Sequence, residues 1–368
     1  MYVSTLDLIN FRNYSKLNIN FNKSLNVFIG ENAQGKTNIL ESIYFISTTK
    51  SHRTIKDREL IKWGSEKAYI GANVNRNSGK YLIESLIGND NKVNFKLNGV
   101  KKNKYSDILG TLNTVIFSPE DLRLIKDGPA VRRRFIDGEL NQIKPKYQYN
   151  LAQYNRALIQ RNNILKSLKG SNSNRITAEI FGEQLAKYGS EICEERYNFI
   201  KKLSLVSRLI HRKITDGNEE IELIYECSTG DFKNKEYTRN QLLSYYTDSI
   251  DEDIRKGFTA KGPHRDDLMI KINGIDARAY GSQGQQRTAA LSLKLSELEI
   301  IKSETLEYPV LLLDDVLSEL DIKRQKFLLE SLKDIQTFIT CTSFSELNNL
   351  NFESKDIFLV HGGTLSKY

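Results

Sequence analysis

The feature that most constrains the fold is the stretch Gly-Glu-Asn-Ala-Gln-Gly-Lys-Thr at residues 30–37. It matches the pattern G-x-x-x-x-G-K-[ST] in full, and it joins the apolar run 25–29 to a stretch with helical spacing from residue 38. Such a turn lets backbone N–H groups and a helix N-terminus converge on a phosphate. The pattern therefore predicts an α/β nucleotide-binding fold; a plain glycine turn into a helix is the alternative.

We call residues 30–37 the phosphate loop. All eight are candidate nucleotide-binding residues: Gly30, Glu31, Asn32, Ala33, Gln34, Gly35, Lys36 and Thr37. We expect the Lys36 ammonium to reach the β and γ phosphates, which also makes it a candidate catalytic residue. We expect the Thr37 hydroxyl to bind Mg²⁺.

A phosphate loop needs a second acid for the metal, and the apolar run 310–313 ends in Asp314 and Asp315. A continuous apolar run is typical of a buried parallel strand. We expect Asp314 to hold Mg²⁺ through water and Asp315 to act in catalysis by polarising the attacking water. An acidic turn after a strand is the alternative. The long interval between the loop and these acids indicates that the nucleotide domain is split by the region between them.

A third element, Ser-Gln-Gly-Gln at residues 282–285, precedes an amphipathic stretch from 287 to 301. At a helix N-terminus, Ser282, Gly284 and Gln285 would offer a hydroxyl and backbone N–H groups to an anion. Since the phosphate loop already surrounds one face of a triphosphate, this second site makes sense if it serves the nucleotide of another subunit. A plain helix cap is the alternative.

The middle of the chain has helical periodicity. Apolar residues recur at spacings of three and four from Leu151 to Leu165, and again from Phe181 to Ile210, on either side of a polar break at 170–174. One helix from about 177 to 213 would be roughly 50 Å long. We expect a helical arm; a helical subdomain without a function of its own is the alternative.

Antiparallel hairpins are predicted on both sides of this arm. Alternating apolar residues precede Asn98-Gly99 and Asn273-Gly274, and Asn-Gly tolerates the positive φ angles of a tight turn. A further strand is expected at 337–340. The predicted fold class is α/β: a mixed, mainly parallel sheet with helices and antiparallel hairpins, split by a mainly α-helical arm.

Composition favours a globular chain with a polyanionic partner. Hydrophobic residues are 39%, charged residues 27%, and 54 Lys and Arg against 46 Asp and Glu give a formal net charge of +8. Candidate DNA contacts are Arg132, Arg133, Arg134, Lys101 and Lys102, and Lys104 and Lys201-Lys202 are further basic features. A solvated face is the alternative for each, and the Arg triplet could instead serve the nucleotide or the architecture of the head.

The cysteines and the hydropathy pattern indicate a cytoplasmic protein. Cys193, Cys227 and Cys341 are far apart and form no C-x-x-C, so a disulfide framework or a structural zinc site is not expected. The start of the chain lacks the pattern of a secretion signal, and no run approaches the roughly 20 apolar residues that span a bilayer. We therefore expect no membrane partner.

The order of these elements resembles the ABC-type ATPases, and 317–321 is similar to their D-loop. A head split by a helical insertion resembles the SMC and RecF branch. Five further segments are similar to signatures of the RecF family: LINFRNY at 8–14, FSPEDL at 117–122, RRRFID at 132–137, KGPHRDD at 261–267 and SQGQQR at 282–287. The resemblance implies an ATPase head at 1–140 and 261–368, with the arm at 141–260.

The same resemblance implies a function. RecF-family proteins bind ATP with Mg²⁺, form an ATP-dependent homodimer and bind single-stranded or gapped duplex DNA. They support recombinase loading with RecR and RecO partners, recombinational repair, replication and SOS induction. Ser282 and Gly284 would complete the partner subunit's site, and Arg12 and Asn13 would lie near the adenine. Alternatives are an SMC-like DNA-organising ATPase, a transporter ATPase subunit and a non-catalytic nucleotide-binding scaffold.

The sequence departs from the common ABC pattern at several places. Asp315 stands where most of these ATPases have Glu, so we expect slow hydrolysis, which suits a switch. No His follows the strand expected at 337–340, and Thr340 or Thr342 is the candidate γ-phosphate sensor. Residues 118–120 take the place of the Q-loop without a glutamine. For His264 we expect a structural or hinge role, with a metal cluster as the alternative.

Overall fold

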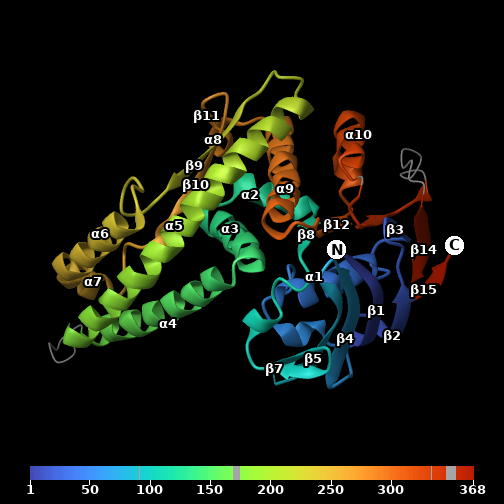
Figure 1. The fold of residues 1–368 in the computed structure, drawn as a ribbon, viewed down its shortest axis with the longest axis horizontal. Coiled ribbons are helices and arrows are strands. Elements are labelled where there is room, and N and C mark those ends of the chain that lie inside the picture. Colours follow the sequence, from blue (N-terminus) through green and yellow to red (C-terminus); the bar gives the residue numbers. More distant parts are fainter. Residues whose placement is uncertain (91, 169–174, 333, 345–353) are drawn as a thin grey trace. The chain divides into compact units, whose positions relative to one another are not determined.

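The computed structural model describes residues 1–90, 92–168, 175–332, 334–344 and 354–368. They form two compact units, and the chain passes from the first into the second and back (Figure 1). Unit 1 comprises residues 1–122 and 290–368, and unit 2 comprises residues 123–289. The polar break predicted at 170–174 lies outside the described residues.

Unit 1 contains a six-stranded, mainly parallel sheet in the order β15-β14-β3-β13-β12-β8. Only β15 is antiparallel to its neighbour. The central strands are buried along their length, as strands with both faces covered must be. This confirms the buried parallel strand predicted at 310–313 and the strand predicted at 337–340, and the apolar run 25–29 forms β3. The bounds are β3 (Leu25–Ile29), β8 (Thr114–Phe117), β12 (Val310–Asp314), β13 (Thr337–Cys341), β14 (Lys355–His361) and β15 (Thr364–Lys367).

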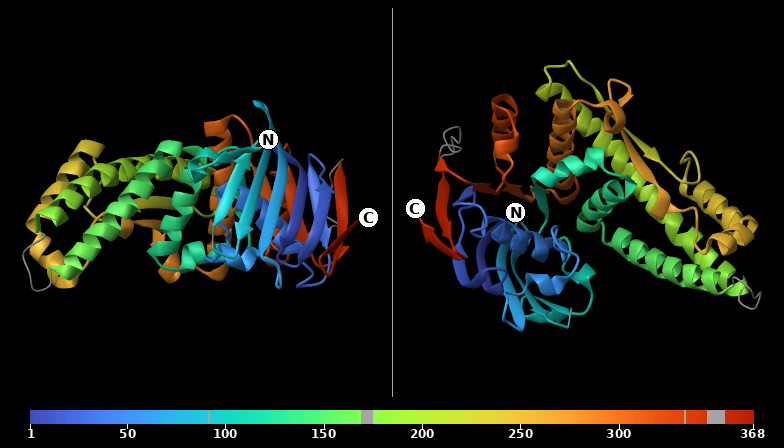
Figure 2. Two further views of the ribbon diagram at one scale, coloured as in Figure 1. Left: turned by 90° about the horizontal axis from the view of Figure 1, so that it is seen from below. Right: turned by 180° about the vertical axis from the view of Figure 1, so that it is seen from behind.

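A second sheet of unit 1 is antiparallel, in the order β2-β1-β4-β5-β6-β7 (Figure 2, left). The predicted hairpin at Asn98-Gly99 is confirmed, since these residues join β6 to β7 with φ angles of 52° and 77°. The bounds are β1 (Tyr2–Phe11), β2 (Tyr14–Asn20), β4 (Lys67–Arg76), β5 (Gly79–Gly88), β6 (Val93–Leu97) and β7 (Val100–Lys102).

One hydrophobic core joins the two sheets of unit 1. It includes Leu6 and Leu8 of the antiparallel sheet, Phe28 and Phe338 of the parallel sheet, and Ile43 of helix α1. Helices α1 (Lys36–Thr48) and α10 (Ile322–Glu330) belong to this unit, as do the short helices η1 (Asp57–Leu60), η2 (Tyr105–Asp107), η3 (Pro119–Leu122) and η5 (Leu317–Glu319). This core fixes the strand and helix between which the phosphate loop lies.

Unit 2 is mainly helical. Its helix α5 (Arg175–Ile214) has 40 residues, about 60 Å at 1.5 Å per residue, which confirms the single helix predicted over 177–213. Helix α5 packs against α4 and α6. The other helices are α2 (Arg123–Lys126), α3 (Pro129–Ile143), α4 (Pro145–Ser167), α6 (Lys235–Asp248), α7 (Ile250–Lys256), η4 (Pro263–Arg265) and α8 (Ala277–Tyr280).

A small antiparallel sheet belongs to the same unit, in the order β11-β10-β9, with bounds β9 (Ile221–Glu226), β10 (Asp267–Ile272) and β11 (Ile275–Asp276). The hairpin predicted at Asn273-Gly274 joins β10 to β11, with φ angles of 52° and 79°. Helix α9 (Gln283–Thr305) begins in unit 2 and ends in unit 1.

The two units differ in their bounds from the domains expected at 1–140, 141–260 and 261–368. Residues 123–140 and 261–289 group with the helices of unit 2. One reason is the ion pair between Arg132 of α3 and Asp267 at the start of β10, with Nε and Oδ1 2.7 Å apart. The domain boundaries stay a prediction.

Candidate nucleotide-binding site

The phosphate loop lies between β3 and α1, where the sequence predicts it. Gly30 has no room for a side chain, since a Cβ atom there would lie 2.4 Å from the carbonyl oxygen of Val360. Gly35 has φ 119°, and its Cβ would lie 2.5 Å from the side chain of Asn13. Both glycines of the motif are therefore required by backbone geometry and close packing.

Two hairpin turns hold this loop. From the turn between β1 and β2, Asn13 Nδ2 donates to Gln34 O at 2.8 Å, and the Tyr14 hydroxyl donates to Gly35 O at 3.1 Å. From the turn between β14 and β15, the N–H groups of Gly362 and Gly363 donate to Gln34. Tyr14 and this glycine pair were not predicted as supports of the loop, although the Gly-Gly turn signal was present in the sequence.

The start of α1 is suited to an anion. Within the described residues, Gly35 caps this helix without a side-chain hydrogen bond, and a helix N-terminus favours an anion such as phosphate. Glu31, Asn32 and Ala33 are exposed on the loop. The Lys36 ammonium contacts the carbonyl oxygen of Gly30 and lies 2.9 Å from that of Glu31.

The structure brings the loop and the predicted acids together. The Thr37 hydroxyl donates to Asp314 Oδ1 at 2.8 Å, across 277 residues of sequence. A hydroxyl beside a carboxylate is a donor set that fits Mg²⁺, which prefers oxygen ligands. These two residues, both predicted as metal ligands, would hold the ion.

Asp315 follows β12 in a left-handed conformation, with φ 54°. Its backbone N–H donates to Thr340 Oγ1 at 2.8 Å, and the Thr340 hydroxyl in turn donates to Asp314 Oδ1 at 2.9 Å. The buried Thr340 therefore positions both acids. Of the two candidate γ-phosphate sensors, Thr342 is the exposed one.

Arg12 lies in the turn between β1 and β2, with φ 51°. Its guanidinium forms a double hydrogen bond with the buried carboxylate of Glu41 on α1, at 2.8 and 2.6 Å. Burial opposes ionisation of Glu41, but hydrogen bonds from Arg12 and Ser51 lower its pKa below the usual value. The pair fastens the turn that carries Asn13 to the helix that follows the loop.

In unit 2, the residues of the Ser-Gln-Gly-Gln element form a helix cap. Ser282 Oγ accepts from the N–H of Gln285 at 3.2 Å, and Gln285 Oε1 accepts from the N–H of Ser282 at 2.9 Å. This is a reciprocal capping box. Ser282 is exposed, whereas Gly284 and Gln285 are partly buried.

The predicted DNA contacts differ in exposure. Arg134 and Lys101 are exposed, and Arg133 and Lys102 are partly buried. Arg132 is 4% exposed and pairs with Asp267. This burial argues against a solvated face and favours a role of Arg132 in the architecture of unit 2.

His264 and two of the cysteines also lie in unit 2. His264 Nε2 lies 3.0 Å from Thr259 O, and burial lowers its pKa to about 4. Cys193 and Cys227, distant in the sequence, have their sulfur atoms 3.9 Å apart. In the described part of the chain, the candidate ligands of a metal cluster gather at Cys193, Cys227 and Asp266, a set that does not include His264.

Comparison with known proteins extends the resemblance over the whole chain. The family model "RecF/RecN/SMC N terminal domain" matches residues 2–364. The DNA replication and repair protein RecF of Alkaliphilus oremlandii is 48% identical over 99% of this chain and 100% of its own. That of Clostridium novyi is 47% identical over 100% of both chains. The chain belongs to the RecF family.

Solved structures agree with this assignment. The recombination mediator protein RecF of the RecFOR pathway, in a structure with ATP, has a TM-score of 0.94 and 40% identity, covering 100% of this chain and 97% of that chain. An Smc head domain of Pyrococcus furiosus, 18% identical with a TM-score of 0.58, covers 100% and 96% and shares the fold. The predicted fold class, an ABC-type head with a helical insertion, is confirmed.

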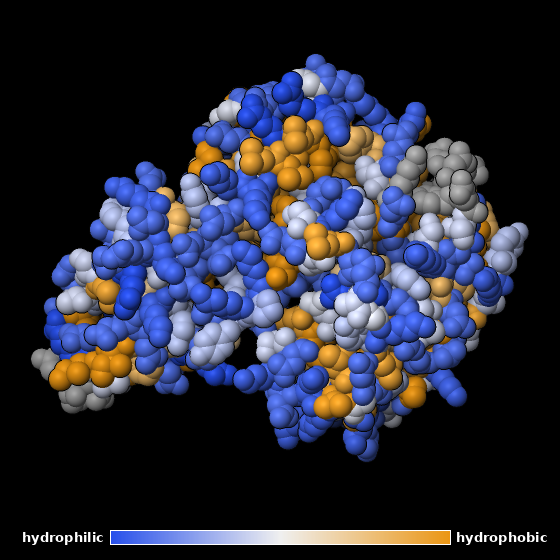
Figure 3. All heavy atoms as spheres, viewed as in Figure 1, coloured by the Kyte–Doolittle hydropathy of each residue, from blue (hydrophilic) through white to orange (hydrophobic). Residues whose placement is uncertain are grey.

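The surface of the protein is mixed in hydropathy. Hydrophilic residues cover most of the face drawn in Figure 3, and apolar residues appear there in several groups. Within the described residues, we find no helix that combines the length and the apolarity needed to cross a membrane.

Proposed function

We propose that this chain is an ATP-controlled DNA-binding switch of recombinational repair and replication. The observation that carries the proposal is the 2.8 Å hydrogen bond between Thr37 and Asp314, which joins the phosphate loop to the end of β12. The relatives support it, because they are named as DNA replication and repair proteins and one solved relative carries ATP.

The chain's own residues would bind the nucleotide as follows. The N–H groups at the start of α1 and the Lys36 ammonium bind phosphate oxygens, while Arg12 and Asn13 lie toward the adenine. Thr37 and Asp314 would hold Mg²⁺, which would neutralise phosphate charge when bound. Asp315 orients water, and because its side chain is one carbon shorter than Glu, hydrolysis is slow.

The switch is a head-to-head homodimer around two nucleotides. Ser282, Gly284 and Gln285 of each subunit contact the nucleotide held by its partner, and hydrolysis reopens the pair. ATP shifts the population toward the closed dimer because it binds that state more tightly. DNA at single-strand gaps binds to the closed state, which supports recombinase loading with RecO and RecR partners and SOS induction.

Sedimentation velocity with a labelled gapped DNA tests this proposal. With ATP, and not with ADP or without nucleotide, the chain should sediment as a dimer that carries the DNA. Ser282→Arg should abolish the dimer while ATP binding is kept, because a bulky cation replaces the small hydroxyl. A matched control is Ser106→Arg, at a partly buried serine of η2 in unit 1. A Ser282→Arg variant that still dimerises with ATP would refute the partner-site role.

The DNA contacts need a separate test. Arg134→Glu and Lys101→Glu reverse exposed charges, whereas reversing Arg132 would break its pair with Asp267. Each reversal should weaken DNA binding several-fold and reduce its salt dependence, since phosphate contacts act through counterion release. Lys166→Glu on α4 is the control at an exposed lysine outside the candidate DNA contacts. Unchanged affinity at low salt would remove these residues from the DNA surface.

A second candidate function, an SMC-like DNA-organising ATPase, is favoured by the fold shared with the Smc head. Compaction of long duplex DNA with ATP would support it. Binding confined to gapped or single-stranded DNA would support the repair function.

A further inference from the structure

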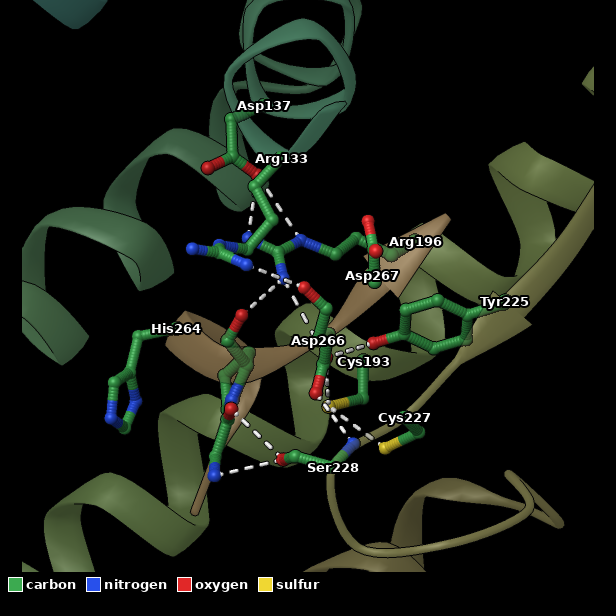
Figure 4. Close-up of polar contacts among 12 residues, drawn as sticks. Arg133, Asp137, Cys193, Arg196, Tyr225, Cys227, Ser228, His264, Asp266 and Asp267 are labelled. Atoms are coloured by element: carbon green, nitrogen blue, oxygen red, sulfur yellow. Dashed lines mark hydrogen bonds and ion pairs between the residues drawn. The ribbon is translucent and has the colours of Figure 1, made fainter. Parts of the chain in front are cut away.

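Two cysteines, 34 residues apart in the sequence, meet inside unit 2 (Figure 4). Cys193 belongs to α5, and Cys227 follows the last residue of β9. Their sulfur atoms lie 3.9 Å apart, and both are free thiols. Cys193 is buried, whereas Cys227 is half-buried. A small oxidant can therefore approach the pair from the side of Cys227.

A metal ion fits this place poorly. A carboxylate oxygen of Asp266 lies within 4.8 Å of both sulfur atoms, as a third ligand would. That carboxylate already accepts hydrogen bonds from the Tyr225 hydroxyl and, at 2.8 Å, from the N–H of Ser228. The buried guanidinium of Arg196 lies 3.6 Å away and would repel a cation. Zinc also prefers four protein ligands in structural sites, and the described residues supply three.

We propose that Cys193 and Cys227 are an oxidation site, at which hydrogen peroxide converts the two thiols into a disulfide that joins α5 to the loop after β9. This site is separate from the nucleotide-binding residues of unit 1, and the proposal does not depend on the proposed function.

The surroundings of the two thiols shift their pKa values in opposite directions, which gives the thiols different roles. The hydrogen bond with Cys193 lowers the pKa of Cys227, which makes the more accessible sulfur the better thiolate. The hydrogen bond with Cys227, together with burial, raises the pKa of Cys193. Cys227 is therefore the attacking group and Cys193 the resolving group.

The reaction balances in two steps. The Cys227 thiolate attacks one peroxide oxygen, the O–O bond breaks, and the leaving hydroxide takes a proton to become water, which leaves a sulfenic acid. The sulfur of Cys193 then attacks the sulfenyl sulfur, the S–O bond breaks, and a second water leaves with the Cys193 proton. Asp266 Oδ2, 3.7 Å from Cys193 Sγ, can accept that proton in passing. The two thiols supply the two electrons that reduce the peroxide.

Bond formation requires a small movement. A disulfide has an S–S distance of about 2.05 Å, so the sulfur atoms must approach by about 1.9 Å. Cys227 lies outside the strand ladder, in a segment that is free of β pairing. Rotation of the two thiol side chains would supply the movement.

The cross-link would act on the segment 261–267, which carries one of the RecF-family signatures. Ser228, next to Cys227, exchanges two hydrogen bonds of 2.9 Å with the backbone of Gly262 and donates its N–H to Asp266. Asp267 then holds Arg132 of α3. A disulfide would therefore fasten α5 to the loop that holds this segment and raise the thermal stability of unit 2.

Peptide mapping tests the proposal on the full chain. The folded protein is treated with hydrogen peroxide, its remaining thiols are alkylated after unfolding, and the unreduced digest is analysed by mass spectrometry. We expect a peptide pair joined through Cys193 and Cys227, with Cys341 alkylated. The melting temperature should rise by about 5–10 °C and return with dithiothreitol.

Three variants sharpen the result. Cys227→Ser should leave Cys193 reduced, and Cys193→Ser should stop at a sulfenic acid on Cys227 that dimedone traps; Cys193→Ala is the substitute if the serine variant does not fold. Cys341→Ser, at a buried thiol of β13, should leave the cross-link intact. Full alkylation of all three thiols after peroxide treatment, or one bound zinc per chain that protects both thiols, would overturn the proposal.

Discussion

The two helix N-termini that the sequence predicts as anion-binding sites, those of α1 and α9, are capped in different ways. At α1, Gly35 is the cap and offers no side chain, so no capping side chain competes with a ligand there. At α9, Ser282 and Gln285 cap the helix reciprocally. A phosphate at α1 would therefore meet no capping side chain in the single chain, whereas an anion at α9 would have to displace an existing cap.

This contrast agrees with an order of events. A nucleotide would bind first at the phosphate loop, where the backbone is already positioned by Asn13 and Tyr14. The contact with the start of α9 would form afterwards, when a second subunit brings its nucleotide. The energetic cost of rearranging the cap at Ser282 would help to make dimerisation depend on ATP.

The largest expected effect concerns the phosphate loop at the start of α1. Lys36→Ala removes the ammonium at the phosphate loop, and we expect ATP affinity to fall by about 100-fold, because charge-assisted hydrogen bonds to phosphate are strong. Equilibrium binding of a fluorescent ATP analogue measures this loss. Lys16→Ala, at an exposed lysine of β2, is the control. Equal affinity for Lys36→Ala and the parent chain would show that the loop is a structural turn.

The next effect tests how the acids are held. Thr340→Val removes the hydroxyl that accepts from Asp315 and donates to Asp314. We expect a loss of about 1–3 kcal/mol in the free energy of unfolding, because buried polar groups lose their partner, together with weaker ATP hydrolysis. Urea denaturation and a phosphate-release assay measure the two effects.

A matched control lies on the same strand. Thr337 is also buried, and its hydroxyl donates to Ile335 O at 3.2 Å, at the other end of β13. Thr337→Val should lower stability and leave hydrolysis per bound ATP unchanged. A similar loss of hydrolysis in both variants would mean that β13 stability, not the position of the acids, is what matters.

Several elements of the fold and of the candidate site could be predicted from the sequence because each depends on a short local pattern. The glycines of the phosphate loop, the apolar run before Asp314, the long periodic stretch of α5 and both Asn-Gly turns each lie within one short segment. Periodicity and turn chemistry decide such elements, and the structure confirms them.

The partners of these residues could not be predicted in the same way. Gly362 reaches Gln34 across 328 residues, and the Cys193–Cys227 and Thr340–Asp314 contacts also depend on topology. The Arg triplet is a further example: a run of charges is typical of a surface, but Arg132 of α3 is buried and pairs with Asp267. Whether one side chain on a helix is buried depends on how the helix packs. The number of charged residues in a segment does not reveal that packing.

A smaller effect concerns the pH dependence of the pair between Arg12 and Glu41, which joins the turn beside the phosphate loop to α1. Glu41 has a pKa lowered by Arg12, so its pairing stabilises the folded chain above the ordinary value of 4.5, and this contribution is lost as pH falls through the lower folded-state pKa. Glu41→Gln should flatten the acid limb of the stability curve and cost about 1–2 kcal/mol at neutral pH. Urea midpoints from pH 3 to 7 measure this, with the exposed Glu66→Gln as control. An acid limb as steep as that of the parent chain would contradict the assignment.

The smallest effect separates the two roles of the α9 cap. Ser282→Ala removes the side-chain acceptor for the N–H of Gln285, and we expect a loss of about 1 kcal/mol in the free energy of unfolding, typical of an N-cap. ATP affinity of the single chain should not change, because the phosphate loop is intact, whereas ATP-driven dimerisation should weaken. Asn234→Ala, at the cap of α6 whose side chain accepts from Tyr237, is a matched control for stability alone. If both variants dimerise normally, the Ser282 hydroxyl is a cap and nothing more, and the comparison between α1 and α9 reduces to one anion site and one ordinary helix start.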